Sequence, residues 1–259
     1  MIKYLSKILA FTLTIATAGC SQNAEEKAET NMATDISQSV YANNPFLKPS
    51  ELYFSYPHFD RFKNEHYTPA LEIGMKEQLA EINAISNNSD APTFKNTIAA
   101  MEQTGAVLDR VSRVFFALTS ADTNDELEAI YSDMAPKLAA HSDAIYLNPA
   151  LFQRIKTVYN QRNDLALDAE SLRLVEINYR DFVRSGANLN EEQKQSLREM
   201  NTKLAELTTQ FGQNVKNEVN DLAVIVDTAK ELDGLSEGAI TAAAEAAKSR
   251  GLKGKYVIA

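Results

Sequence analysis

The sequence has no tryptophan, a single cysteine, and few glycines and prolines, nine and seven respectively. The scarcity of glycine and proline argues against a β-sandwich or barrel with many tight turns and favours helices. A net charge of −9 argues against a general nucleic-acid-binding protein, and we expect no nucleic-acid partner. The 259 residues, of which 44% are hydrophobic, are enough for one or two packed domains.

Histidine is also scarce, and the three histidines, His58, His66 and His141, show no metal-ligand spacing. The chain contains no His-Glu-x-x-His, no Gly-x-Ser-x-Gly, no phosphate-binding loop and no dinucleotide fingerprint. We therefore assign no catalytic, cofactor-binding or metal-binding residue to this chain. The three histidines are interpreted as capping or packing residues.

Charged side chains on the expected helices offer one candidate site. Arg110 and Arg113 lie one helical turn apart and can together hold an anion. The alternative interpretation is a surface salt bridge to Asp109 or Asp122. Other acidic side chains are interpreted as solvated helix faces: Glu126, Glu128 and Asp133.

The N-terminal stretch MIKYLSKILAFTLTIATAGCSQ has two lysines followed by an apolar run that is too short to span a membrane comfortably. Its Thr-Ala-Gly-Cys ending resembles a bacterial lipoprotein cleavage site. We predict that residues 1–19 are a signal peptide and that Cys20 is lipidated. Ser21 favours sorting to the outer membrane, on the periplasmic side of the cell envelope. The alternative is an ordinary signal peptide cut near the same point.

Three further segments follow from the pattern of polar and apolar residues. Residues 20–43 are polar and cannot form a core, so we expect a flexible tether from lipid to domain. Residues 44–220 read as a helical lobe. Residues 221–259 read as the start of a β/α segment that is cut off, because a second β-type run begins at residue 256 and the sequence stops at Ala259.

Within the lobe, residues 190–220 predict one long helix with Asn190 as its N-cap. Its apolar residues recur every three or four positions, which is one stripe along a helix. We expect the shorter helices to bury this stripe together with their own. The stripe consists of Leu197, Met200, Leu204, Leu207, Phe211 and Val215.

Shorter helices are predicted from caps, prolines and apolar periodicity. Gly105 lies inside the second and is expected to mark a bend or close packing, and Pro136 is expected to kink or split the third. Asn148 and Asp168 are predicted N-caps, and Gly186 a helix end. The expected helices are 68–86, 92–118, 123–145, 148–162, 168–186 and 237–250.

Two β-type runs, residues 222–226 and 256–259, flank the last helix. A lone pair of strands is marginally stable in water, and the second run is very short. We expect these runs to leave an open apolar edge that promotes self-association.

Several long stretches resemble the N-terminal region of bacterial peptidyl-dipeptidases, also called dipeptidyl carboxypeptidases, of the thimet oligopeptidase family of zinc metallopeptidases. The resemblance covers residues 44–259 in order. The stretches are PTFKNTIAAME (92–102), RVSRVFFAL (110–118), APKLAAHSDAIYLNPALFQRI (135–155), RLVEINYRDFVRSGANL (173–189), LAELTTQFGQNV (204–215) and AAEAAKSRGLKGKYVI (243–258).

The resemblance implies a mainly α fold, the multi-helix N-terminal lobe of a two-lobed peptidase built around a deep channel. Family members release dipeptides from the C-terminus of oligopeptides and are more than twice as long as this chain. Their zinc site lies beyond the point that matches Ala259, so zinc belongs to the full-length family and none is expected to be bound here. The implied role of this chain is an inactive N-terminal fragment that forms a channel wall, with oligopeptides and the missing catalytic part as partners.

A second hypothesis stays open beside it. The chain can be a stand-alone helical envelope lipoprotein that binds peptides or a partner protein.

Overall fold

The computed structural model describes residues 43–258, so Cys20, the predicted signal peptide and nearly all of the predicted tether lie outside the described residues. Short 3-10 turns occupy Pro45–Leu47, Tyr53–Ser55, Asn64–His66 and Ala229–Leu232. The longer elements are α2 (Tyr67–Ser86), a π-type segment (Phe94–Ala99), α3 (Ala100–Glu102), α4 (Ala106–Ala121), α5 (Asp125–Tyr146), α6 (Pro149–Gln161), α7 (Ala169–Arg184), α8 (Glu191–Asp221), β1 (Val224–Val226), α9 (Glu237–Ser249) and β2 (Tyr256–Ile258).

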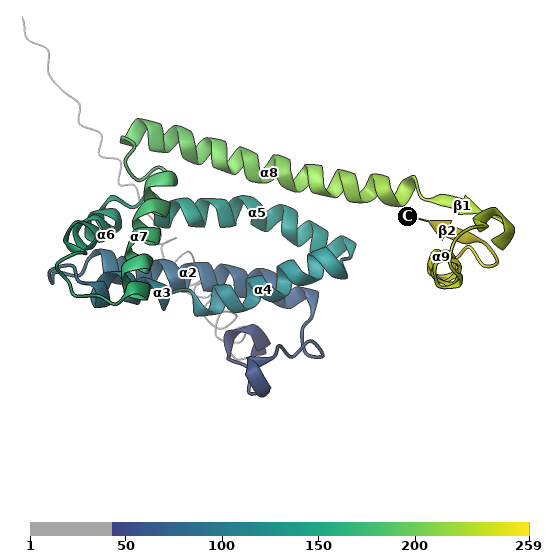
Figure 1. Ribbon diagram of the computed structural model, residues 1–259, viewed down its shortest axis with the longest axis horizontal. Coiled ribbons are helices and arrows are strands. Elements are labelled where there is room, and N and C mark those ends of the chain that lie inside the picture. Colours follow the sequence, from purple (N-terminus) through teal and green to yellow (C-terminus); the bar gives the residue numbers. More distant parts are fainter. Residues whose placement is uncertain (1–42, 259) are drawn as a thin grey trace, which may run out of the picture.

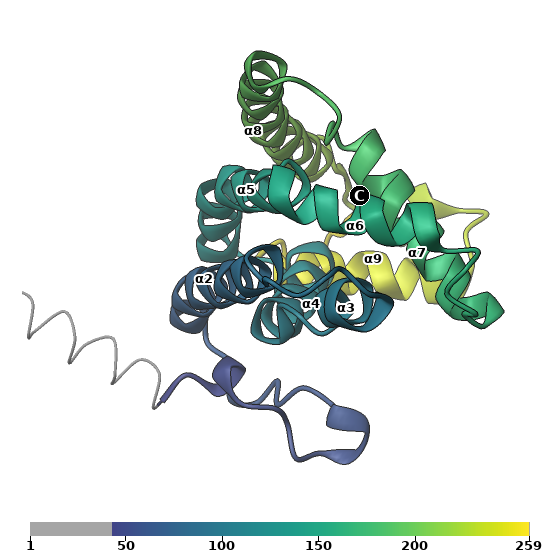
Figure 2. The same cartoon turned by 90° about the vertical axis from the view of Figure 1, so that its left-hand side faces the viewer.

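The predicted fold class is confirmed: the described chain is mainly helical, with two short antiparallel strands near its C-terminal end. In Figure 1, α8 runs along α5, α2 and α4 lie on the other side of α5, and α6 and α7 close one end of the stack. Figure 2 shows the same order of layers from the side. Among residues 43–258, no helix combines the length and apolar character needed to cross a membrane.

Local capping signals fix the helix ends where the sequence predicts them. The Asn148 side chain accepts hydrogen bonds from the backbone of Ala150 and Leu151, and Asn190 forms a capping box with Gln193. Gly186 follows α7 with a φ of 99°. The backbone N–H of Ala187 then donates to the carbonyl of Phe182 (3.0 Å), which completes a Schellman end.

Two apolar clusters hold the helical body together. One lies between α2, α6 and α7, where Phe182 stacks on Phe152 with parallel rings. The other lies between the N-terminal segment, α2, α4 and α5, where Tyr67 contacts the buried rings of Phe46 and Phe115. Burial of these large side chains is the main force that orders the short helices.

A buried arginine anchors the connection between α2 and the π-type segment. Arg154 of α6 is 6% exposed. Its guanidinium donates to the carbonyls of Asn88 (2.7 Å) and Asp90 (3.1 Å) and to the side-chain oxygen of Asn96 (3.1 Å). These bonds satisfy backbone groups that a loop next to the core leaves without partners.

The expected single helix over residues 92–118 is wrong, because the chain breaks before Gly105. This residue adopts a left-handed φ of 76° and starts α4. Its N–H donates to the Glu81 carboxylate of α2 (2.8 Å), and a side chain here would meet Gln78. Contacts with α2 therefore turn a glycine that a helix can tolerate into a break between two helices.

Pro136 does not split the third expected helix. Residues Asp125–Tyr146 form one helix with this proline inside it. Met134 and Ile145, on either side of the proline, are both buried. Packing of α5 on its neighbours offsets the backbone hydrogen bond that proline cannot make.

The predicted burial of the apolar stripe of the long helix is wrong. Helix α8 forms with the predicted cap, but the stripe from Met200 to Val215 is exposed to solvent, with Phe211 70% exposed. The opposite, polar face of α8 packs on α5 instead, where Thr209 is 6% exposed. Periodicity shows that a helix has a stripe, but it does not show which body the stripe faces.

The two β-type runs pair with each other, and the predicted self-association through an open apolar edge stays a prediction. β1 and β2 are antiparallel, with Ile225 opposite Val257. Helix α9 packs against them and buries Val257 and Ala247, which gives this small unit a core of its own. The unit lies beyond the end of α8 (Figure 1), and Arg250 donates to the side chain of Asn220 (3.0 Å).

Candidate functional site

The three histidines do not come together. Among residues 43–258, no three side chains of His, Cys, Asp or Glu form a cluster able to hold a metal ion. His66 caps the turn before α2 by accepting the backbone N–H of Lys63 (3.1 Å). His58 lies 3.5 Å from the carboxylate of Glu51. The three histidines therefore do not fit a zinc site, and we derive no catalytic step from them.

His141 lies in the interior between α5 and α2. Its Nε2 is 2.7 Å from the side-chain oxygen of Gln78, and the side chain is 8% exposed. Burial lowers the pKa of His141, so the ring is neutral at pH 7, and its Nε2–H donates to the Gln78 side-chain oxygen. This histidine has a packing role.

A cavity of about 460 Å³ lies between the N-terminal segment and the first turns of α4. Its walls combine prolines and apolar side chains with cationic groups and with the carboxylates of Glu51 and Asp109. The apolar part is formed by Pro45, Pro49, Pro57, Phe62 and Val114, and the cationic part by Lys48, Arg61, Arg110 and Arg113.

The two arginines singled out in the sequence line this cavity, but each is already engaged with protein atoms. Arg113 Nε donates to both carboxylate oxygens of Asp109 (2.8 Å), and this hydrogen bond raises the pKa of Arg113. Arg110 Nη1 donates to the carbonyl of Phe46 (2.6 Å). The salt bridge to Asp109 is thus the interpretation that the structure supports for Arg113, whereas Arg110 ties the N-terminal segment to α4.

Beside the cavity, the N-terminal segment presents exposed aromatic rings that the sequence analysis did not single out. Tyr53 and Phe54 are 84% and 89% exposed, and their rings lie 4.3 Å apart. Phe54 and Ser55 both have positive φ angles of 56°, which non-glycine residues rarely adopt. The backbone here holds apolar rings away from the body.

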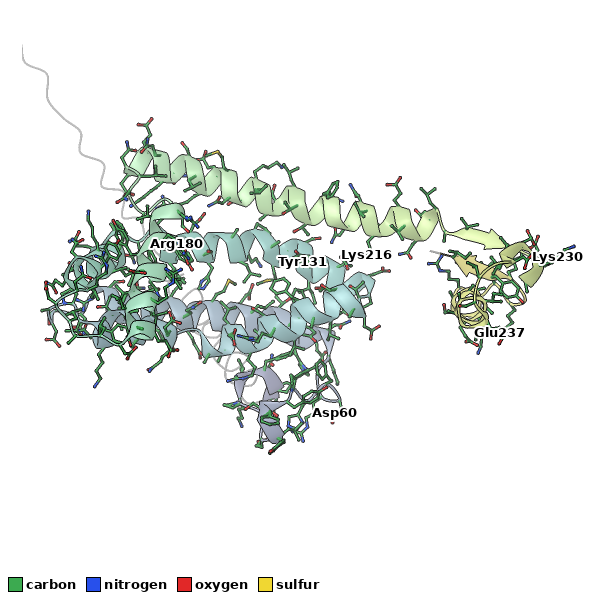
Figure 3. The ribbon with its side chains drawn as sticks, viewed as in Figure 1. Asp60, Tyr131, Arg180, Lys216, Lys230 and Glu237 are labelled. Carbon is green, nitrogen blue, oxygen red and sulfur yellow. The ribbon has the colours of Figure 1, made fainter. Side chains whose placement is uncertain are left out.

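Polar side chains join α8 to α5 along their whole contact. Asn201 donates to the carboxylate of Asp143 (2.7 Å), and Gln213 donates to Ser132 (2.8 Å). Near the far end, Lys216 forms an ion pair with Glu128 and also donates to the carbonyl of Thr119 (3.2 Å). Figure 3 shows Lys216 at the side of α8 that faces α5.

Glu128 is the electrostatic centre of this contact. Burial alone would raise the pKa of its carboxyl, but hydrogen bonds from Lys216, Thr123 and Gln213 outweigh burial, and the pKa is lowered. Glu128 is therefore ionised near pH 7 and holds α8 by its charge. The interpretation of Glu128 as part of a solvated helix face is therefore wrong.

On its other side, α8 presents what we call the outward stripe. Its members are between 43% and 71% exposed, although all are apolar. Exposed apolar surface of this extent on a folded body is typical of an interaction surface. The outward stripe consists of Met200, Leu204, Leu207, Phe211, Val215, Val219 and Leu222.

Comparison with known proteins identifies the relatives of this chain, although no protein-family profile matches it. The chain is 45% identical to a dipeptidyl carboxypeptidase of Escherichia coli over 83% of its own length and 32% of that protein. It is 46% identical to a dipeptidyl carboxypeptidase of Salmonella typhimurium over 84% and 32% of the two chains. An oligopeptidase A of Haemophilus influenzae is 29% identical over 82% of this chain and 30% of that protein.

These relatives confirm the resemblance inferred from the quoted stretches. The chain spans about a third of the length of the curated relatives that it matches. By sequence, this chain is homologous to about one third of the length of the dipeptidyl carboxypeptidases of E. coli and S. typhimurium, and more distantly similar to oligopeptidase A.

Proposed function

We propose that this chain is the non-catalytic part of an envelope peptidyl-dipeptidase and forms one wall of its substrate channel. The observation that carries the proposal is the 45% identity to a dipeptidyl carboxypeptidase over most of the chain. The substrates would be oligopeptides that lose C-terminal dipeptides. The zinc site would belong to the polypeptide that corresponds to the other two thirds of the relatives.

Two features of the described residues support a structural role. The charged and polar groups of α5 and α8 are used to hold helices together, and no metal-ligand cluster occurs among residues 43–258. The exposed apolar surfaces of α8 and of the N-terminal segment are of the kind that a neighbouring body covers. A wall that limits access by shape needs rigid helices and no reactive group.

The proposed location follows from the N-terminus, which lies outside the described residues. A lipid on Cys20 would hold the protein at the periplasmic face of the outer membrane. The stretch between Cys20 and residue 43 would let the helical body stand off the membrane surface.

A chimeric enzyme tests the proposed function. In the E. coli dipeptidyl carboxypeptidase, the stretch that matches this chain is replaced by residues 43–258, and release of dipeptides from an N-blocked oligopeptide is measured. We expect activity well above that of the same enzyme with the stretch deleted, because the helical wall is restored. A folded chimera that releases no dipeptide would contradict the proposal.

The second candidate, a stand-alone lipoprotein that binds peptides or a partner protein, is favoured by the cavity beside α4. Calorimetric titration of the whole chain with short acidic peptides separates the two. Saturable binding that Arg61→Ala weakens would favour the stand-alone binder, whereas no binding together with an active chimera favours the channel wall.

A further inference from the structure

We propose that the outward stripe of α8 is a docking surface for the polypeptide that corresponds to the two thirds of the relatives beyond this chain. This proposal rests on the proposed function. It names the surface through which this chain would contact the catalytic part. It concerns residues 200–222, none of which belongs to the cavity beside α4.

The size of the surface is the first argument. From Met200 to Leu222 the outward stripe is about 33 Å long, at ~1.5 Å of rise per residue. Phe211, near its centre, is 70% exposed, and Leu204 is 60% exposed. The apolar surface then continues onto β1, where Val224 is 57% exposed. Apolar surface of this length gains free energy whenever a second body removes it from water.

The direction of the stripe is the second argument. A surface helix normally turns its apolar side to its own core and its polar side to water. In α8 the arrangement is reversed, because Asn201, Gln213 and Lys216 contact α5 while Leu207 and Phe211 face outward. Such a helix lies between two bodies, one of which is the helical stack described here.

The spacing of the stripe argues against a second copy of the same helix. From Met200 to Phe211 the steps are four, three and four, which suits a two-stranded coiled coil. From Phe211 to Leu222 they are four, four and three, which is an eleven-residue repeat of opposite supercoil tendency. A self-paired coiled coil would therefore lose its seam halfway along, whereas a broad folded surface accommodates both halves.

The length of the relatives identifies the occupant. About two thirds of the dipeptidyl carboxypeptidases of E. coli and S. typhimurium have no counterpart in the match. A polypeptide of that size that works with this chain must cover part of its surface. Among the described residues, the outward stripe and its continuation on β1 form a long apolar surface that is available for it.

Cysteine labelling tests the docking surface. In a Cys20→Ala background, which removes the only native cysteine of the chain, Leu204→Cys and Phe211→Cys are compared with the control Glu206→Cys. Glu206 is exposed on the same helix but lies off the stripe. In the chain alone, all three should react with a maleimide at similar rates. In the chimeric E. coli enzyme, the two stripe cysteines should react at least about tenfold more slowly, and Glu206→Cys should change less.

A second measurement again compares the chain alone with the chimeric E. coli enzyme. Phe211→Lys should leave the thermal midpoint of the chain alone unchanged and lower that of the chimera, whereas Glu206→Lys should lower neither appreciably. If the chimera does not fold, the residue aligned with Phe211 in the E. coli enzyme itself is changed to cysteine and labelled before and after unfolding. Protection in the folded enzyme is expected.

The outcomes separate the two proposals. Stripe cysteines that label as fast as Glu206→Cys in a folded chimera would overturn the docking surface, even if the chimera is active. A protected stripe in a chimera that releases no dipeptide would keep the surface and reject the channel-wall function. Stripe cysteines that are already protected in the chain alone, with a doubled mass by light scattering, would assign the surface to a second copy and also overturn this proposal.

Discussion

Lys216 of α8 and Glu128 of α5 form an ion pair on the face of α8 that lies away from its apolar stripe. Helix α8 is therefore fixed to the body through charge and hydrogen bonds, and its apolar residues remain available. This arrangement links the fold to the proposed role, because a helix bound by its polar side can serve as the framework for a second body.

The pH dependence of the pair can be measured. Because the pKa of Glu128 is lowered in the folded chain, its contribution to stability is complete above the ordinary glutamate pKa of about 4.3 and is lost as the pH falls through the lowered value. We expect Glu128→Gln to reduce the free energy of unfolding by about 1 kcal/mol at pH 7. Urea unfolding at pH 7 and pH 3 checks this, since the difference from wild type should be smaller at pH 3 than at pH 7. An unchanged difference at both pH values would show that the charge of Glu128 is not responsible.

Two phenylalanines distinguish the buried core from the outward stripe. Phe182 is 1% exposed and stacks on its neighbours, so Phe182→Ala should cost about 3–5 kcal/mol of stability. Phe211 is 70% exposed, so the same change there should alter stability by less than about 0.5 kcal/mol in the chain alone. Chemical unfolding of both variants measures these costs. Similar large losses at both sites would mean that the stripe is buried within this chain.

Two glycines differ in whether an added side chain would meet other atoms of the body. Gly105→Ala places a Cβ 2.4 Å from Gln78 at a φ of 76°, which should destabilise the chain by at least about 1–2 kcal/mol. Gly212 lies within α8 and has no atom within 4 Å of an added Cβ, so Gly212→Ala should stabilise by about 0.5–1 kcal/mol. Thermal unfolding followed by circular dichroism compares them. A neutral Gly105→Ala would show that the break before α4 tolerates an ordinary residue.

The sequence predicts those features of the fold that depend on neighbours in the chain. The caps at Asn148, Asp168 and Asn190 form because a side-chain oxygen reaches a backbone N–H two or three residues away. The Schellman end at Gly186 is equally local.

Features that depend on distant residues were not predictable in this way. The break at Gly105 is decided by Glu81 and Gln78 of α2, and the orientation of α8 by Glu128 and Asp143 of α5. The same limit applies to the candidate site. The sequence placed Arg113 beside Asp109, one turn away, but gave no sign that Arg110 would bond to the distant Phe46.

The proposed anchor is tested in cells with a fatty-acid analogue. The N-terminal pattern predicts that wild type is labelled and that Cys20→Ala is not, because the thiol of Cys20 is the proposed attachment point. Ser21→Ala serves as the matched control and should still be labelled. Equal labelling of wild type and Cys20→Ala would refute lipidation at this residue.

We propose that the residues described here supply shape and that the part of the relatives beyond the match corresponds to the catalytic centre. The most direct measurement is an assay of residues 20–259 alone, with zinc content determined after dialysis. We predict no release of C-terminal dipeptides from an N-blocked oligopeptide and no zinc retained in stoichiometric amount, since the histidines lie apart. Release of dipeptides that a chelator abolishes, together with one zinc per chain, would contradict the account.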